Sequence, residues 1–213
     1  MMDHTLGFGF DLSRVQTTGD NLPPLVIRKS RDDDIEAMLE IYQHHIARDV
    51  EQSAFREADL VHAEDIKRRR KNMRNKRLPH VVADENGRVV GFAFAVPFRK
   101  RPAYRYTLKH SIYVHHEKLR GGIGQKLLSA LIDACAAEGF RQMIGYIDAA
   151  NSASINLHNK LGFIEVGRLP SIGFKFGRWT DSVLVQRSLG PGATTLPDMA
   201  TSESGRTPSS PDD

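Results

Sequence analysis

The sequence predicts an α/β fold in which helices cover both faces of a mixed central sheet. Short apolar segments rich in Val, Ile and Phe alternate with longer segments whose apolar residues recur at helical spacing. Asn86-Gly87 is a typical hairpin turn between two of the short segments. A glycine-rich turn at 121–124 separates a further strand segment from a helical one. Strands and helices that alternate around hairpins are typical of a layered α/β domain.

The chain is long enough for one domain with flanking segments, because it has 213 residues. Residues 1–24 are rich in Gly, Thr and Asp and end in Pro23-Pro24, which predicts a flexible leader. Residues 190–213 hold almost no large apolar side chains, which predicts a disordered tail. The folded domain is therefore expected over 25–189.

The first half of this domain is expected to hold two helices. A strand at Leu25–Arg28 precedes the first helix, which Ser30 or Asp32 would cap. The apolar residues of this helix recur at helical spacing: Ile35, Met38, Leu39, Tyr42 and Ile46. A second helix is expected from about 59 to 75. It carries the basic run 67–77, which we interpret as a solvated face, with a nucleic-acid contact or the steering of a substrate as alternatives.

The remaining elements follow the second helix in order. Strands are expected at 80–83, 88–97 and 106–114, and a basic, aromatic loop at 98–105 joins the last two. The glycine turn then opens a helix that ends near Gly139. A strand at 142–147, a short helix from Asn151 to Gly162, and strands at 163–167 and 174–186 complete the domain.

The glycine turn is a candidate phosphate site. Glycines allow a ligand to approach the backbone, and the first amides of the following helix are free donors. A Walker loop is excluded, because Gln125, Lys126 and Leu127 follow Gly124 where Lys-Ser/Thr is required. A Rossmann fingerprint stays as a weak alternative: its third glycine is replaced by Leu127, although Asp148 follows at about the expected distance.

Two motifs together resemble the GCN5-related N-acetyltransferase (GNAT) family. The turn Leu119-Arg120-Gly121-Gly122-Ile123-Gly124 resembles the Q/R-x-x-G-x-G/A loop that holds the pyrophosphate of acyl-CoA, with Leu119 at the Gln/Arg position. About thirty residues later, Asn151-Ser-Ala-Ser-Ile-Asn-Leu-His-Asn-Lys-Leu-Gly-Phe163 resembles the N-x-x-S-x-x-L-H/Y-x-K-L-G-F element of the same family. Gly173-Phe-Lys-Phe-Gly-Arg-Trp179-x-Asp181 is similar to the phosphinothricin and methionine sulfone/sulfoximine acetyltransferase branch.

The resemblance implies a mostly antiparallel sheet, acetyl-CoA as co-substrate, a small amino-acid-like amine as acceptor, and a homodimer. It assigns the pyrophosphate to Leu119, Arg120, Gly121, Gly122, Ile123 and Gly124, and the pantetheine arm to Asn151 and Ser154. A backbone amide near Ile112, Tyr113 and Val114 would stabilise the negative charge on the thioester oxygen. His158 stands where many relatives carry a tyrosine that protonates the leaving thiolate.

The resemblance does not decide which residue acts as the general base. The branch places a glutamate where this chain has Lys109, and a lysine is no carboxylate base unless burial lowers its pKa strongly. Glu57, His110 and a water relayed by His158 are the alternatives. On a strand, Lys109 and His110 face opposite ways. Glu57, Tyr104 and Lys175 are the candidates for binding the acceptor, together with the cationic loop 99–105.

Composition limits other functions. A net charge of +4 does not by itself indicate nucleic acid, and no aromatic residues interleave the basic run, so we expect no nucleic-acid partner. No apolar run is long enough for a membrane span, and no signal peptide is expected. Cys135 lies in an apolar helix pattern, which predicts a buried structural thiol and a cytoplasmic protein. The adjacent pairs His44-His45 and His115-His116 lack metal-ligand spacing, so no metal is expected.

These observations predict an acetyl-CoA-dependent N-acetyltransferase that acts on a small amino-acid-like amine. Two alternatives remain. The same fold could acetylate a polyamine or a protein amine, or the chain could be a non-catalytic CoA-binding module, since Leu119 and Lys109 depart from the family pattern.

Overall fold

The computed structural model describes residues 25–50, 62–175 and 177–197, and the prediction about Glu57 lies outside them. One seven-stranded sheet organises these residues, in the order β1-β2-β3-β4-β5-β7-β6. The strands are β1 Leu25–Lys29, β2 His80–Glu85, β3 Arg88–Pro97, β4 Thr107–Val114, β5 Gln142–Asp148, β6 Ile164–Lys175 and β7 Arg178–Ser188. Every pair is antiparallel except β4–β5, so the predicted mixed, mostly antiparallel sheet is confirmed.

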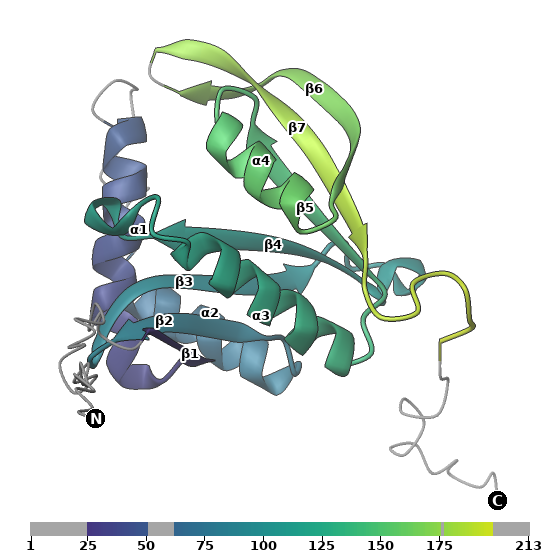
Figure 1. Ribbon diagram of the computed structural model, residues 1–213, viewed down its shortest axis with the longest axis horizontal. Coiled ribbons are helices and arrows are strands. Elements are labelled where there is room, and N and C mark those ends of the chain that lie inside the picture. The colour runs from purple at the N-terminus through teal and green to yellow at the C-terminus, as the bar shows by residue number, and fades with distance from the viewer. Residues whose placement is uncertain (1–24, 51–61, 176, 198–213) are drawn as a thin grey trace, which may run out of the picture.

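Helices cover both faces of the sheet, as the sequence predicts. Helix α3 (Ile123–Ala137) lies on one face of β2–β4, and α1 (Ile35–Val50) and α2 (Ala63–Asn75) lie on the other (Figure 1). The fourth helix, α4 (Ser152–Lys160), follows β5. Helix α3 buries one apolar stripe, which includes Leu127, Leu128 and Leu131. Cys135 belongs to the same stripe, and burial raises the pKa of its thiol to about 12, so the prediction of a structural thiol is confirmed.

The two parallel strands at the middle of the sheet separate soon after they pair. Strands β4 and β5 are paired only over Thr107–Lys109 and Gln142–Ile144 among their residues, all of which the structure describes. Beyond that point β4 continues along β3, whereas β5 continues along β7 (Figure 1). We call the point where the strands part, at His110 and Gly145, the strand fork.

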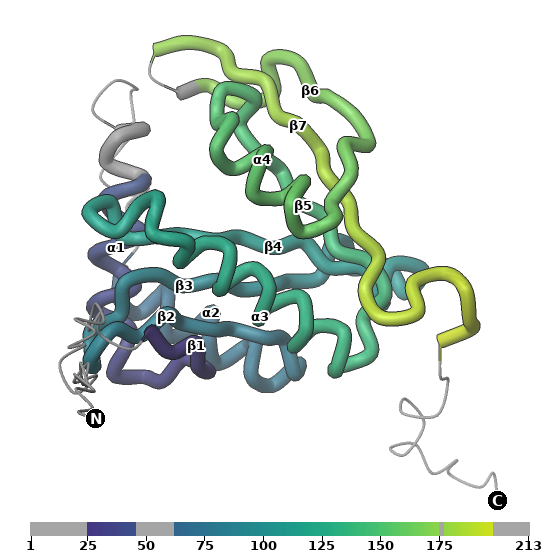
Figure 2. Tube along the Cα trace, viewed as in Figure 1, coloured from purple at the N-terminus to yellow at the C-terminus, as the bar shows by residue number. Residues whose placement is uncertain are grey.

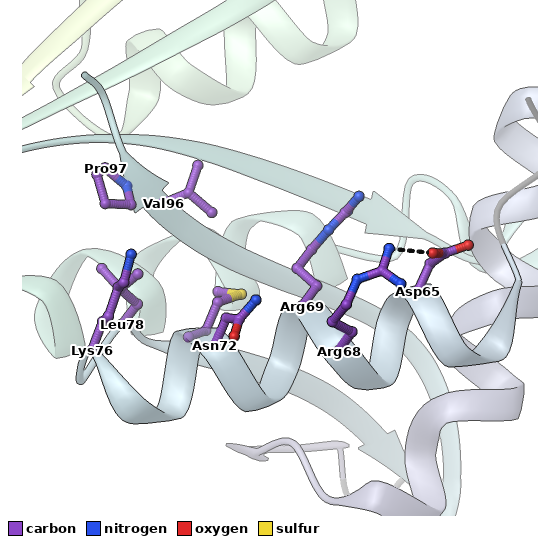
Figure 3. A pocket seen from close by; sticks show the side chains of 9 residues that line it. Asp65, Arg68, Arg69, Asn72, Lys76, Leu78, Val96 and Pro97 are labelled. Atoms are coloured by element: carbon purple, nitrogen blue, oxygen red, sulfur yellow. Dashed lines mark hydrogen bonds and ion pairs between the residues drawn. The ribbon is translucent and has the colours of Figure 1, made fainter. Parts of the chain in front are cut away.

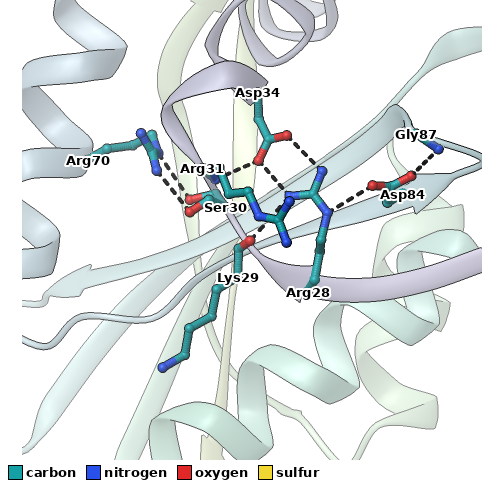
Figure 4. Close-up of polar contacts among 8 residues, drawn as sticks. All are labelled: Arg28, Lys29, Ser30, Arg31, Asp34, Arg70, Asp84 and Gly87. Atoms are coloured by element: carbon teal, nitrogen blue, oxygen red, sulfur yellow. Dashed lines mark hydrogen bonds and ion pairs between the residues drawn. The ribbon is translucent and has the colours of Figure 1, made fainter.

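An ion-pair cluster, rather than a simple helix cap, fixes the N-terminal end of the domain. The Asp34 carboxylate accepts from the Arg31 backbone N–H and from both terminal nitrogens of Arg28, and Arg28 Nε also donates to Asp84 (Figure 4). The expected cap by Ser30 or Asp32 is therefore wrong. A short 3-10 turn, Asp32–Asp34, precedes α1, and Asp34 occupies the capping role because it can bind both the backbone and Arg28.

The basic run on α2 is only partly a solvated face. Arg68 pairs with Asp65 at 2.5 Å on the exposed side. Arg70, in contrast, is buried, and it donates to the Ser30 hydroxyl at 3.0 Å and pairs with Asp32. The interpretation of the whole run as solvated is thus wrong for Arg70, because this side chain docks α2 on the segment after β1.

The C-terminal hairpin differs in two respects from the predicted strands at 163–167 and 174–186. Lys175 pairs with Arg178 across the hairpin, so the second predicted strand is divided between β6 and β7. Strand β6 is one element of twelve residues and includes the predicted break at 168–173, with Pro170 and Gly173. Two register irregularities absorb these residues, and within the second Ser171 takes a positive φ of 51° while its N–H donates to Asp181. Proline and glycine are tolerated in a strand where the ladder is irregular. Figure 2 shows the resulting bent path of β6 along β7.

The other turns agree with the prediction. Asn86 and Gly87 both have positive φ, as a type I′ hairpin requires, and Gly162 ends α4 with a φ of 77°. Beyond β7, Arg141 donates to the Gly192 carbonyl, the Thr195 hydroxyl and the Leu196 carbonyl. No helix in the described parts of the chain is long and apolar enough to cross a membrane.

Candidate active site

The glycine turn ends in free amide donors at the start of α3. Gly122 precedes the helix with a φ of 76°, a conformation that L side chains rarely adopt. The first bond of the helix runs from Lys126 N to Gly122 O at 3.2 Å. The amides of Ile123, Gly124 and Gln125 therefore precede the regular helical bonding pattern and point out of the helix end, where a helix favours negative charge. The predicted turn is confirmed, and its geometry suits a phosphate.

The backbone of β4 offers further polar groups beyond the strand fork. His115 N donates to Val90 O. In an antiparallel pair every second residue bonds to the neighbouring strand, so the amides of Tyr113 and Ser111 also face β3. The amides of Ile112 and Val114 consequently point to the side from which β5 has diverged. Tyr113 differs from the prediction, because its amide faces β3 and its ring packs against Tyr42 and Phe92, each 5.0 Å away. Burial raises the pKa of Tyr113 to about 12.

Two predicted histidines meet at the strand fork. His110 Nε2 lies 2.9 Å from His158 Nε2, and both rings are buried. His110 Nδ1 lies 3.1 Å from the Ile144 carbonyl oxygen, and His158 Nδ1 lies 2.7 Å from the Ser154 carbonyl oxygen. A Cβ on Gly145 would lie 2.9 Å from His110 Cε1, so this position of β5 must be glycine for the ring to fit.

The hydrogen-bond partners of this histidine pair leave a place for one proton more than two neutral rings carry. A carbonyl oxygen only accepts, so each Nδ1 must be the donor to its carbonyl. Two bare Nε2 lone pairs would then face one another at 2.9 Å, and a third proton between them completes the network. Burial lowers the pKa of His110 to about 3, and it lowers the pKa of His158 as well, while the carbonyl contacts oppose both shifts. Burial thus favours the neutral rings, and the facing Nε2 atoms leave a position where one added proton would be shared.

The second motif forms α4 and carries His158 to the fork. Asn151 caps the helix, with its side-chain oxygen accepting from Ser154 N at 3.0 Å. The Ser154 hydroxyl is half-buried and lies 3.4 Å from His158 Nδ1. A Cβ on Gly124 would lie 3.3 Å from Leu157 Cδ2, so the glycine turn approaches α4 closely. The two motifs thus meet in space although they are far apart in the sequence.

The candidates for acceptor binding are less closely grouped. Lys109 is exposed and faces away from buried His110, as the alternation of the strand predicts. Tyr104 lies in the loop after β3, packs edge-on against Phe98, and has the Arg99 guanidinium 5.6 Å from its ring. Lys175 ends β6 opposite Arg178, and its side chain is outside the described set.

Sequence reasoning missed two features. One is the contact between His110 and His158, and the other is a layer of aromatic rings on the sheet. The rings of His80, Phe92, Phe94 and Tyr113 stack on the face of the sheet that α1 and α2 cover. Alternate aromatic residues on β3 were the available signal. At the outer end of β4, His44 stacks on His116 at 3.8 Å. No group of three metal-ligating side chains occurs in the described ranges.

Comparisons with known proteins agree with this geometry. Residues 39–163 match the model of the acetyltransferase (GNAT) family. The chain is 40% identical to the phosphinothricin N-acetyltransferase of Alcaligenes faecalis over 81% of its own length and 86% of that protein. It is 43% identical to the L-methionine sulfoximine/L-methionine sulfone acetyltransferase of Salmonella typhimurium over 52% of its length and 65% of that relative.

A solved structure is similar over most of the fold. It is the phosphinothricin acetyltransferase of Sinorhizobium meliloti in complex with AcCoA, which matches with a TM-score of 0.75 and 38% identity over 83% of this chain and 94% of that one. The match to the family model covers more than half of the chain and includes both motifs. The chain belongs to the acetyltransferase (GNAT) family and is an N-acetyltransferase.

Proposed function

We propose that the protein transfers an acetyl group from acetyl-CoA directly to the amine of a small amino-acid-like acceptor of the phosphinothricin or methionine sulfoximine/sulfone type. The observation that carries this proposal is the strand fork, because the glycine turn packs against β4 just beyond it and the His110–His158 pair lies at it. Relatives whose names give these acceptors are 40% and 43% identical to the chain where they match, and a phosphinothricin acetyltransferase of solved structure has a similar fold.

The residues at the fork fit acetyl-CoA in charge and in shape. The turn Leu119–Gly124 would hold the pyrophosphate on its amides, because a side chain at Gly122 would require a strained conformation. The pantetheine arm would lie along the unpaired side of β4, within reach of Asn151 and Ser154. The departure at Leu119 removes a polar side chain from the turn but no backbone donor.

The proposed reaction uses the histidine pair twice. The unprotonated amine attacks the thioester carbon, and the amide of Ile112 or Val114 stabilises the negative oxygen. As the carbon–nitrogen bond forms, the nitrogen loses a proton through one water to the His110–His158 pair. As the carbon–sulfur bond breaks, His158 returns this proton to the sulfur. The products are the acetylated amine and a free thiol, and the pair returns to its neutral state.

This reaction accounts for the absence of the glutamate at position 109. Lys109 faces away from the pair, so it cannot exchange a proton with the histidines. His110, on the opposite side of the strand, supplies the basic nitrogen instead. Glu57, which lies outside the described residues, would contact the acceptor rather than take its proton.

The experiment that tests the function measures thiol release from acetyl-CoA with a panel of amines. We expect turnover with phosphinothricin, methionine sulfoximine and methionine sulfone, and none with spermidine or a lysine peptide. Turnover confined to spermidine or the peptide would overturn the acceptor class. Binding of acetyl-CoA without turnover of any amine would instead support the non-catalytic module.

We further propose a homodimer formed through β6 and β7. These strands expose large apolar side chains, among them Ile164, Ile172, Phe174 and Trp179, which are each 49–66% exposed. The Phe174 and Trp179 rings pack against each other, 5.4 Å apart, and exposed apolar clusters typically mark an interface. Sedimentation equilibrium tests it, and a monomer at micromolar concentration would contradict it. A cytoplasmic location is proposed from the single free thiol, Cys135, and cell fractionation tests it.

A further inference from the structure

A second concave surface lies between α2 and the end of β3. It has a volume of about 400 Å³, and we call it the α2 groove (Figure 3). Its floor is apolar, and its rim carries the polar side chains of α2. The lining residues are Asp65, Arg68, Arg69, Asn72, Met73, Lys76, Leu78, Val96 and Pro97.

The register of the sheet places this groove beside the strand fork. Val96 lines the groove and is paired with Lys109, the last residue of β4 that pairs with β5. Paired residues of adjacent strands point to the same face, so Lys109 projects on the groove side. The Arg69 guanidinium lies 5.6 Å from the Phe94 ring, and Phe94 is paired with Ser111, which lies on the same face of β4 as Lys109. An acceptor with its side chain in the groove would therefore approach the unpaired edge of β4 from the face opposite the two histidine rings.

The groove carries excess positive charge. Among the described residues that line it, Asp65 is the only acidic one, and Arg68 already binds it at 2.5 Å. Within the described part of the chain, neither Arg69 nor Lys76 forms an ion pair, and Lys109 adds a third cation without one. Three cations around an apolar floor suit a ligand with a short aliphatic chain and a terminal anion.

We infer that the α2 groove binds a second anionic group of the acceptor, a carboxylate, phosphinate or phosphonate at the end of its side chain, with Arg69 as the main contact. This inference rests on the proposed acetyl transfer to small amino acids. It adds a preference within that class for acceptors with an anionic side chain over neutral ones of the same shape.

Phosphinothricin and methionine sulfone provide a matched pair of acceptors. Both end in a methyl group on a tetrahedral centre with two oxygens, but the phosphinate is anionic and the sulfone is neutral. We expect the wild-type protein to have a higher kcat/KM for phosphinothricin. Arg69→Gln should reduce the ratio of the two kcat/KM values about ten-fold or more, which is typical for the loss of a charged hydrogen bond. The loss should appear in KM for phosphinothricin, with little change for the sulfone.

Lys71→Met is the matched control. Lys71 lies on α2, is exposed, and does not line the groove. Its replacement by Met removes one positive charge, as Arg69→Gln does. An unchanged ratio in Arg69→Gln, or an equal decrease in Lys71→Met, would overturn the inference while acetyl transfer remained intact. Absence of transfer to both acceptors in the wild-type protein would instead reject the proposed function.

Discussion

Replacing His158 with glutamine is expected to lower kcat by about 10²–10⁴-fold, which is the usual contribution of a positioned acid or base. His158 is fully buried, donates to the Ser154 carbonyl and contacts His110, so it can hold the transferred proton within the site. Glutamine keeps a polar group of similar size in the cavity. KM for acetyl-CoA should change little, because the amides of the glycine turn are untouched. Steady-state kinetics with a saturating acceptor would measure the effect.

The same experiment can establish whether the two histidines act as one unit. His110→Gln alone should reduce kcat to a similar extent, and the double variant should be hardly worse than either single one, because groups that share one proton are not additive. Thermal unfolding of all three variants controls for loss of the fold. Additive losses would show that the rings act independently and that the pair does not share a proton.

Asp34→Asn is expected to lower the free energy of unfolding by about 2 kcal/mol. Breaking a fully buried ion pair costs about 3–5 kcal/mol. The smaller value is expected here because the Arg28 side chain is 20% exposed and keeps Asp84 as a partner. The change removes one negative partner from Arg28 and weakens the acceptor of the Arg31 amide. Urea unfolding at pH 7 measures the difference, with exposed Asp33→Asn as the matched control.

The pH dependence of this loss has a definite sign. Burial acts to raise the pKa of Asp34, but its bonds with Arg28 and Arg31 outweigh burial and hold the pKa below its usual value. A carboxylate with a lowered pKa in the folded state stabilises the fold above its unfolded pKa, about 3.9, and loses this contribution as the pH falls further. The difference between wild type and Asp34→Asn should therefore be constant at neutral pH and decrease below about pH 4. A difference that increased in acid would contradict this account.

Local sequence signals predicted most of the fold and the two motifs that meet at the candidate site. The glycine turn, the Asn86-Gly87 hairpin and the cap of α4 were predictable, because each depends on residues within a few positions of one another. The contact between His110 and His158 was not, since the two lie 48 residues apart and no short-range pattern links them. The continuity of β6 could not be predicted for a related reason. The irregular backbone at Ser171 is stabilised by the side chain of Asp181, which lies on the neighbouring strand.

The short pairing of β4 with β5 also bears on how the domain resists aggregation. Past the strand fork, both strands present backbone groups that no neighbouring strand occupies within the described sheet. Such an edge can be paired by any extended chain, and proteins usually protect it. A ligand that lies along β4 would occupy the same donors and acceptors that a foreign strand would need. If acetyl-CoA binds along β4 as proposed, it would cover this edge while it is bound and keep a foreign strand from pairing there.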